Sequence, residues 1–190
     1  NRHYMQNQIA KYKHQIASRY LPITQNEIET KILKSDLYSI STKYDGHFYG
    51  LNFDGEKAEL INHGGNVITD LPLLNEAFEK LNKSECNKAI LVGELYVYKK
   101  GGRTRSFDLK AELDEKSENI HFAVFDIISI NDNEILGIKE TDEKLNSIFK
   151  GGKKIYPVKN QFVETRKDIV KFYENTVIDE GLEGVIVRCL

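Results

Sequence analysis

Lys43-Tyr44-Asp45-Gly46 separates two stretches that read as β-strands, and this unit decides the fold that the sequence predicts. Residues 37–42 alternate apolar and polar side chains and contain several β-branched residues, and residues 47–53 also read as a strand. A lysine in such a strand-turn-strand unit has a fixed place on a sheet, which suits a covalent nucleophile. An ordinary lysine has a pKa of about 10.4, so nucleophilic use requires desolvation or nearby cations that lower that value.

Three further strand-like segments follow the lysine along the chain. Each contributes an acidic, aromatic or basic side chain: Glu94 within residues 91–97, Phe125 within residues 121–128, and Glu183 and Arg188 within residues 180–188. Core packing can also explain the phenylalanine, and turn chemistry can explain Glu183. A carboxylate in the middle of a buried strand costs stability unless it is paired or functional, so Glu94 is the hardest to explain as packing.

Together with the lysine, these segments resemble the ordered motifs of the covalent nucleotidyltransferase superfamily. This superfamily comprises ATP-dependent DNA ligases, RNA ligases and mRNA capping enzymes. The chain carries its K-x-D-G, G-E-L and F-D-I patterns, followed by a Glu-Gly-Val segment that ends in a base, all between residues 38 and 188. Their order and spacing are similar to those in the adenylation domain of a small ATP-dependent DNA ligase.

The resemblance implies a fold that agrees with the residue patterns. Strands that alternate with helical stretches, and a tight hairpin at Asp54-Gly55, indicate the α+β class. Among the helical stretches, Met5, Ile9, Tyr12, Ile16 and Tyr20 recur at helical spacing, and Thr24-x-x-Glu27 and Thr165-x-x-Asp168 are patterns typical of helix starts. We expect a nucleotidyltransferase (ATP-grasp-like) domain of mainly antiparallel sheets flanked by helices. Residues 1–36 are expected to be a helical leader packed on the core, and residues 37–190 an adenylation domain that is incomplete at its C-terminus. The last family motif and the OB-fold are expected beyond this chain.

The resemblance also implies a role for each motif residue. Lys43 would attack the α-phosphorus of ATP and carry AMP, and Mg²⁺ would neutralise the phosphate oxygens. Glu94 and Glu183 would bind the metal or the ribose, and the sequence does not divide these roles between them. Either Phe122 or Phe125 would stack on adenine, and the motif favours Phe125. The other nucleotide-binding residues are expected to be Thr42, Asp45, Gly46, His63 and Arg188.

Two positions depart from the ligase pattern. Phe48 stands where ligases commonly carry an arginine, two residues after the glycine of K-x-D-G, and His63 replaces the arginine of S-R-x-G. The loss of two cations would weaken the recognition of phosphate or of a 5′ end, unless His63 or neighbouring lysines compensate.

Composition bounds the class of protein. The 190 residues carry a net charge of −2, so global electrostatics do not indicate a nucleic-acid partner, although basic clusters occur locally. In one of these clusters, Arg103 and Arg105 are candidate DNA contacts. No apolar run approaches the length of a membrane helix, and two cysteines without metal spacing indicate a reducing compartment, cytoplasmic or nuclear.

The sequence therefore predicts a monomeric adenylation domain of an ATP-dependent DNA ligase that acts on nicked duplex DNA in replication, repair or recombination. An RNA ligase and a capping guanylyltransferase remain alternatives within the superfamily. A nucleic-acid-binding module that has lost the chemistry is the alternative from another class.

Overall fold

The computed structural model describes residues 2–16, 22–100, 108–134, 137–178 and 184–190. The chain divides into two compact units: Asn1–Arg19 with Asp45–Pro157, and Tyr20–Tyr44 with Val158–Leu190. Neither unit is a continuous stretch of chain, because the chain leaves the first unit after its N-terminal helix and returns to it at Asp45. The division expected at residue 36, between a leader and a domain, stays a prediction.

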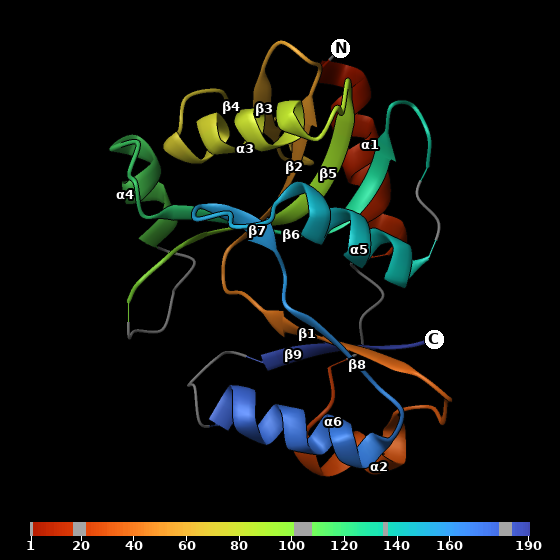
Figure 1. Cartoon of the computed structure of the whole chain (residues 1–190). Coiled ribbons are helices and arrows are strands. Elements are labelled where there is room, and N and C mark those ends of the chain that lie inside the picture. The colour runs from red at the N-terminus through yellow and green to blue at the C-terminus, as the bar shows by residue number, and fades with distance from the viewer. Residues whose placement is uncertain (1, 17–21, 101–107, 135–136, 179–183) are drawn as a thin grey trace. The chain divides into compact units, whose positions relative to one another are not determined.

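The first unit is built on a six-stranded sheet with the order β4-β3-β2-β5-β6-β7 (Figure 1). All neighbouring strands pair antiparallel except β6 and β7, which are parallel. The mainly antiparallel sheet that the sequence predicts is therefore confirmed. The strands are β2 (His47–Phe53), β3 (Ala58–Ile61), β4 (Val67–Ile68), β5 (Ala89–Val97), β6 (Ile120–Ile130) and β7 (Ile155–Pro157).

The hairpin predicted at Asp54-Gly55 joins β2 to β3. Gly55 has a φ of +91°, which a residue with a side chain rarely adopts. The Asp54 carboxylate accepts backbone N–H bonds from Glu56 and Lys57, each at 2.9 Å. This turn fixes the pairing register of β2 with β3, and so decides which residues of β2 face each side of the sheet.

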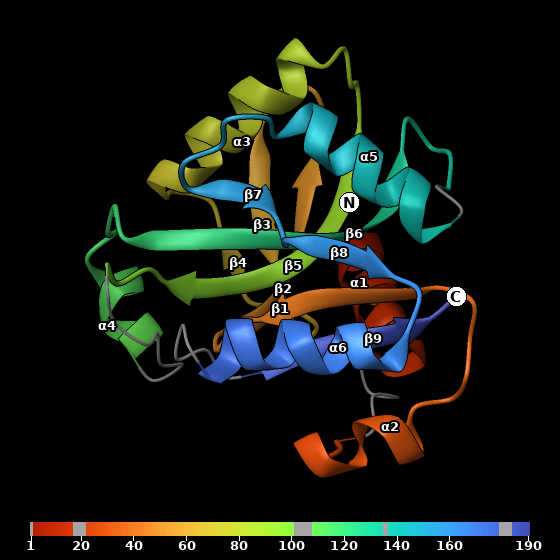
Figure 2. The same cartoon turned by 60° about the horizontal axis from the view of Figure 1, so that its bottom comes forward.

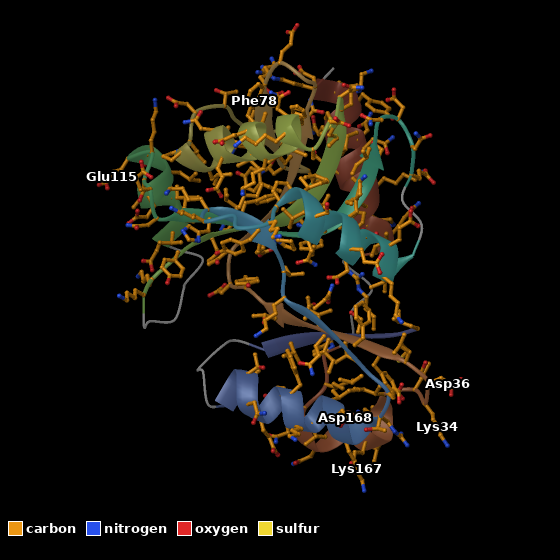
Figure 3. All side chains as sticks on the ribbon, in the orientation of Figure 1. Lys34, Asp36, Phe78, Glu115, Lys167 and Asp168 are labelled. Carbon is orange, nitrogen blue, oxygen red and sulfur yellow. The ribbon has the colours of Figure 1, made fainter. Side chains whose placement is uncertain are left out.

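One face of the sheet holds the main core, beneath helices α3 (Pro72–Lys83), α4 (Leu109–Asp114) and α5 (Ile138–Ile148) (Figure 1). Leu51 of β2, Leu91 of β5 and Phe122 of β6 point into this core and are fully buried. Phe78 of α3, labelled in Figure 3, packs edge-on against Phe53 with ring centroids 5.8 Å apart. Because side chains alternate along a strand, the residues between these core positions face the other side.

Helix α1 (Arg2–Gln15) packs on that other face. Met5 and Ile9 are buried there against Ile61 of β3, as the helical spacing of these apolar residues predicts. Gly50 of β2 makes room for the helix, because a Cβ at that position would lie 2.2 Å from the Ile9 side chain. The buried carboxylate of Glu59 accepts two hydrogen bonds from the Arg2 guanidinium, each at 3.2 Å. The helix is therefore anchored at its first turn as well as by its apolar stripe.

A single carboxylate, that of Glu76 on α3, holds the loop that leads into β7. Its Oε1 accepts backbone N–H bonds from Lys153, Lys154 and Ile155 at 2.8–2.9 Å. Removal of an acceptor that three amides share leaves donors without a partner, and bonds to a charged group are the strong ones. We expect Glu76→Ala to lower the free energy of unfolding by about 2–3 kcal/mol in urea denaturation.

Glu79 provides the matched control on the same helix. Its carboxylate is exposed and pairs with Lys83 across one turn. Such exposed pairs contribute little to stability, so Glu79→Ala should have little effect on the free energy of unfolding. Equal losses in the two variants would show that the amide cluster does not stabilise the fold.

The second unit contains a three-stranded antiparallel sheet with the order β8-β1-β9 (Figure 2). The apolar side chains of β1 pack against the helices, and Tyr38, Ile40 and Ile169 are almost fully buried. The helical elements are the 3-10 helix η2 (Gln25–Glu27), the α-helices α2 (Ile28–Lys31) and α6 (Arg166–Tyr173), and the π-helix η4 (Glu174–Ile178). The strands are β1 (Tyr38–Lys43), β8 (Asn160–Val163) and β9 (Gly184–Cys189).

Both helix starts predicted in this unit are confirmed. Thr24 and Glu27 form a capping box at the start of η2. Thr165 caps α6, where its hydroxyl accepts a hydrogen bond from the backbone N–H of Asp168, labelled in Figure 3. Such caps satisfy amides that have no partner within the helix.

Among the residues that the structure describes, no helix is long and apolar enough to cross a membrane.

Candidate nucleotide site

Lys43 is the last residue of β1 and its side chain is exposed. Along this strand Tyr38 and Ile40 face the apolar core of the second unit. Alternation therefore puts Ser39, Ser41 and Lys43 on the opposite, polar face. The lysine that the motif selects is thus held by a paired strand and directed away from the core.

Arg188 belongs to the same polar face. In the register of β1 with β9, Lys43 lies opposite Gly184 and Ser39 lies opposite Arg188, and directly opposed residues share a face. Four residues along a strand span about 13 Å, so the two residues lie some distance apart on one surface of the sheet. Glu183, which immediately precedes β9, lies outside the described residues.

Thr42 is directed differently from the lysine that follows it. It is buried, and it lies opposite Val185, which packs on the core of the second unit. Its side chain therefore faces the core, and only its backbone belongs to the polar edge.

Gly46 precedes β2 in the first unit, where the backbone comes against β5. A Cβ on Gly46 would lie 2.1 Å from the carbonyl oxygen of Leu95 and 2.9 Å from the Cβ of Tyr96. A glycine is required here by close backbone approach. Asp45, beside it, is half-buried.

Glu94 is half-buried in β5, and it does not face the main core. Its cross-strand partners are Phe48 of β2 and Ala123 of β6, so it stands on the same face as α1. Its neighbours Gly93 and Leu95 alternate to the core side. The sequence could not tell how a carboxylate is tolerated in this apolar strand; the face on which it stands explains it.

The two candidate adenine-stacking residues lie on opposite faces of β6. Phe122 is fully buried in the main core and has no surface to offer a ligand. The pairing of β5 with β6 shifts between Val92 and Gly93, and the shift leaves Phe125 as the extra residue. Phe125 is half-buried on the face of α1, where its ring centroid lies 5.8 Å from that of Phe48. Of the two, Phe125 is therefore the one able to stack.

Tyr12 of α1 also belongs to this aromatic group, and the sequence did not predict its contacts with Phe48 and Phe125. Its ring lies 6.0 Å from Phe48 and 6.3 Å from Phe125, measured between centroids. Its hydroxyl donates a 2.5 Å hydrogen bond to the Asp126 carboxylate. The spacing of Met5, Ile9 and Tyr12 predicted a packed helix, but nothing in it identified the strands beneath.

His63 lies on the exposed turn between β3 and β4. Its Nδ1 lies 3.4 Å from the Nζ of Lys13 on α1. Arg103 and Arg105, the candidate DNA contacts, lie outside the described residues.

A second polar group lies on the sheet face that also carries Glu94 and Phe125. His121 of β6 is 9% exposed, and its ring stacks on that of Tyr98 with centroids 4.6 Å apart. Its Nδ1 shares a 2.6 Å hydrogen bond with the Tyr156 hydroxyl, which also contacts the hydroxyl of Tyr96. The imidazole is thus enclosed by tyrosines.

This enclosure predicts a pH dependence of stability. Burial, with a smaller contribution from Lys154, lowers the pKa of His121, and Glu76 opposes the shift. The folded state favours the neutral ring. The contribution of His121 to the free energy of unfolding is therefore fully present above a pH of about 6.5, and it is lost as the pH falls below that value. The melting temperature should therefore fall more between pH 7.5 and 5.5 in the wild type than in His121→Gln. Equal falls would rule out His121 as the group responsible.

Magnesium is the metal that the resemblance implies, and the described residues fit it in part. They contain no group of three or more His, Cys, Asp or Glu side chains that could hold a metal ion. Mg²⁺ commonly takes only one or two carboxylates and completes its shell with water and phosphate oxygens. Glu94 is a suitable ligand of this kind, either for the metal or for a ribose hydroxyl.

Comparisons with known proteins show which family the sequence matches. The ATP dependent DNA ligase domain family matches residues 16–190. DNA ligase 4 of Gallus gallus is 24% identical over 177 residues, covering 83% of this chain and 19% of that protein. DNA ligase 2 of Haloquadratum walsbyi is 27% identical over 164 residues, covering 80% of this chain and 26% of that protein. The chain thus spans about a fifth to a quarter of the length of these curated relatives.

Solved structures share the fold. A structure named Pmar-Lig_Pre has a TM-score of 0.66 at 16% identity, covering 94% of this chain and 45% of that one. The ATP-dependent DNA ligase of bacteriophage T7, in complex with ATP, has a TM-score of 0.61 at 16% identity, covering 89% and 60%. An archaeal ATP-dependent RNA ligase has a TM-score of 0.52 at 17% identity, covering 87% and 41%. The α+β nucleotidyltransferase fold expected from the sequence is therefore confirmed.

Proposed function

Because the chain belongs to the ATP dependent DNA ligase domain family, we propose that it is the adenylating part of a DNA ligase and carries AMP on Lys43. The two units bear Lys43, Arg188 and Glu94 on sheet faces other than those that carry the two larger apolar cores. Lys43 and Arg188 lie on the face of β1 and β9 that is turned away from the apolar core, and Glu94 lies on the face of β5 opposite the main core. The observation that carries the proposal is that the side chains of Lys43, Arg188 and Glu94 do not enter either of these cores.

The first chemical step is the attack of a neutral Lys43 amine on the α-phosphorus of ATP. An N–P bond forms, the bond from the α-phosphorus to the bridging oxygen of pyrophosphate breaks, and the amine loses a proton to solvent. Phosphoryl transfer depends mainly on in-line positioning and on neutralised oxygens. A lysine at the end of a paired strand meets the requirement for positioning.

The other motif residues bind and orient the nucleotide. Phe125 supplies an aromatic face for adenine, and Glu94 and Glu183 supply carboxylates for ribose or Mg²⁺. Arg188 supplies a permanent cation for phosphate. Asp45 and Gly46 shape the turn after the lysine, and Mg²⁺, when bound, neutralises phosphate oxygens.

The later steps act on nicked duplex DNA. AMP passes to the 5′-phosphate at the nick, and the 3′-hydroxyl then displaces AMP and closes the strand. We assign these steps to the whole protein, with an OB-fold as the expected second domain and a monomer as the expected state. The cysteines Cys86 and Cys189 are both free, which supports a reducing compartment, cytoplasmic or nuclear.

Covalent labelling tests the proposal. The longest form of the protein is incubated with α-labelled ATP or GTP and Mg²⁺, and acid-labile label on the protein is measured. Label from ATP is expected. Label from GTP alone would indicate the capping reaction, and no label from either nucleotide would leave a binding module without chemistry.

An RNA ligase is the second candidate, because the archaeal RNA ligase shares this fold. Sealing of nicks with a ribose or a deoxyribose at the 3′-hydroxyl distinguishes the two. A DNA ligase should seal the deoxyribose nick at least as fast as the ribose nick.

A further inference from the structure

Lys13 is a cation that connects the two positions where this chain departs from the ligase pattern. Its ammonium lies 5.9 Å from the ring centroid of Phe48 and 3.4 Å from the Nδ1 of His63. Each of these residues stands where related ligases commonly carry an arginine. One side chain from α1 therefore places positive charge beside both positions.

Contacts along the whole of α1 fix the place of Lys13. Arg2 binds the buried Glu59 in the first turn, and Met5 and Ile9 are buried in the middle. Tyr12, the residue before Lys13, stacks on Phe48. The backbone of Lys13 therefore cannot shift without disturbing buried contacts.

Hydrogen bonds also hold the turn that carries His63 in place. Gln6 of α1 donates a 3.2 Å hydrogen bond to the carbonyl oxygen of His63. Within the turn, the side chain of Asn62 accepts the backbone N–H of Asn66 at 2.7 Å. Lys13 and His63 thus face each other from two elements that are joined independently of their own contact.

The Lys13 ammonium retains hydrogen-bonding capacity. It has three donors, the imidazole can accept only one bond, and the aromatic face attracts the charge without neutralising it. Among the described residues, the partners recorded for Lys13 are His63 and Phe48, and neither carries negative charge. By contrast, Lys99 and Lys116 each pair with an aspartate.

The location of this cation indicates what it binds. Phe48 lies directly opposite Glu94 and contacts Phe125, so Lys13 stands beside the face that carries the proposed nucleotide residues. On the basis of the proposed function, we propose that Lys13 and His63 form a phosphate-binding pair that replaces the absent arginines. The phosphate group belongs either to ATP or to the DNA strand, which present the same chemistry.

Lys13→Gln tests the proposal, with Lys11→Gln as the matched control. Lys11 lies on the same helix and is exposed. Binding of ATP and of adenosine is measured by calorimetry, and binding of nicked duplex DNA is measured over a range of salt concentrations. Melting temperatures of both variants establish that α1 stays packed.

If the phosphate belongs to ATP, Lys13→Gln should weaken ATP binding about tenfold and leave adenosine binding within about twofold. If it belongs to DNA, ATP binding should stay unchanged, DNA binding should weaken, and the slope of log K against log salt should fall by about 1. Phe48→Arg, added to Lys13→Gln, should restore part of the lost affinity.

Equal behaviour of Lys13→Gln and Lys11→Gln in both arms would overturn the proposal. That result differs from a failure of the proposed function, in which the wild type itself would take no label from ATP. If Lys13→Gln also lowered the melting temperature, Lys13→Arg would separate the two effects. This variant keeps the charge and should bind phosphate within about threefold of the wild type.

Discussion

Lys43→Ala is expected to abolish covalent labelling by ATP, with a fall of more than about 10³-fold, because the variant has no amine to form the N–P bond. Lys43 is exposed at the end of β1, so the change should alter the free energy of unfolding by less than about 0.5 kcal/mol. Labelling is followed by denaturing gel electrophoresis of the protein beside acid-treated samples, which should lose the label, and folding is followed by thermal melting.

Two controls make this result specific. Lys34→Ala removes an exposed lysine of the same unit, labelled in Figure 3, and should leave labelling intact. Lys43→Arg keeps a cation but remains protonated at any working pH, so it should fail as Lys43→Ala does. Label that persisted in Lys43→Ala would show that another residue is the nucleophile and would contradict the assignment of Lys43.

Gly46→Ala is expected to destabilise the protein by about 3 kcal/mol, because the added methyl group would meet backbone that cannot move aside. Its Cβ would lie 2.1 Å from the Leu95 carbonyl oxygen, inside β5, which pairs with β2 on one side and β6 on the other. Relief requires displacement of the strand that carries Glu94. We therefore expect both a lower urea midpoint and weaker nucleotide labelling at temperatures where the variant is still folded.

Gly64→Ala is the matched control for this substitution. The nearest atom to a Cβ at Gly64 would be the side-chain oxygen of Asn62, at an ordinary 3.5 Å. Gly64→Ala should lower the free energy of unfolding by less than about 1 kcal/mol, as expected for a surface position. If Gly46→Ala were tolerated as well as Gly64→Ala, the close approach at Gly46 would not be a constraint on the motif.

Local signals in the sequence predicted much of the fold. The hairpin at Asp54-Gly55 and the cap at Thr165 depend on residues that are neighbours in the chain, and both are confirmed. The stripe on α1 also marked Met5 and Ile9 as buried, whereas Ile16, which follows the helix at the same spacing, is exposed. A periodic pattern does not show where its helix ends.

The direction of the candidate side chains was harder to predict. Phe122 and Phe125 read alike, since both are aromatic residues in one apolar strand. Residues three apart in a strand lie on opposite faces, but only the packing shows that Phe122 enters the core and that Phe125 faces α1. Thr42 and Lys43 are adjacent in the motif, yet the strand turns the threonine inward.

The sequence by itself indicated the order of the motifs, the lysine that we propose as the nucleophile and the strands that carry these motifs. These follow from chemistry and from contacts between chain neighbours. Only the tertiary structure decided that Tyr12 and Lys13 stand beside Phe48, and that Glu94 and Phe125 share a face. The reason is physical: which face a side chain occupies depends on strand register and bulges, and which helix covers that face depends on contacts between residues far apart in the chain.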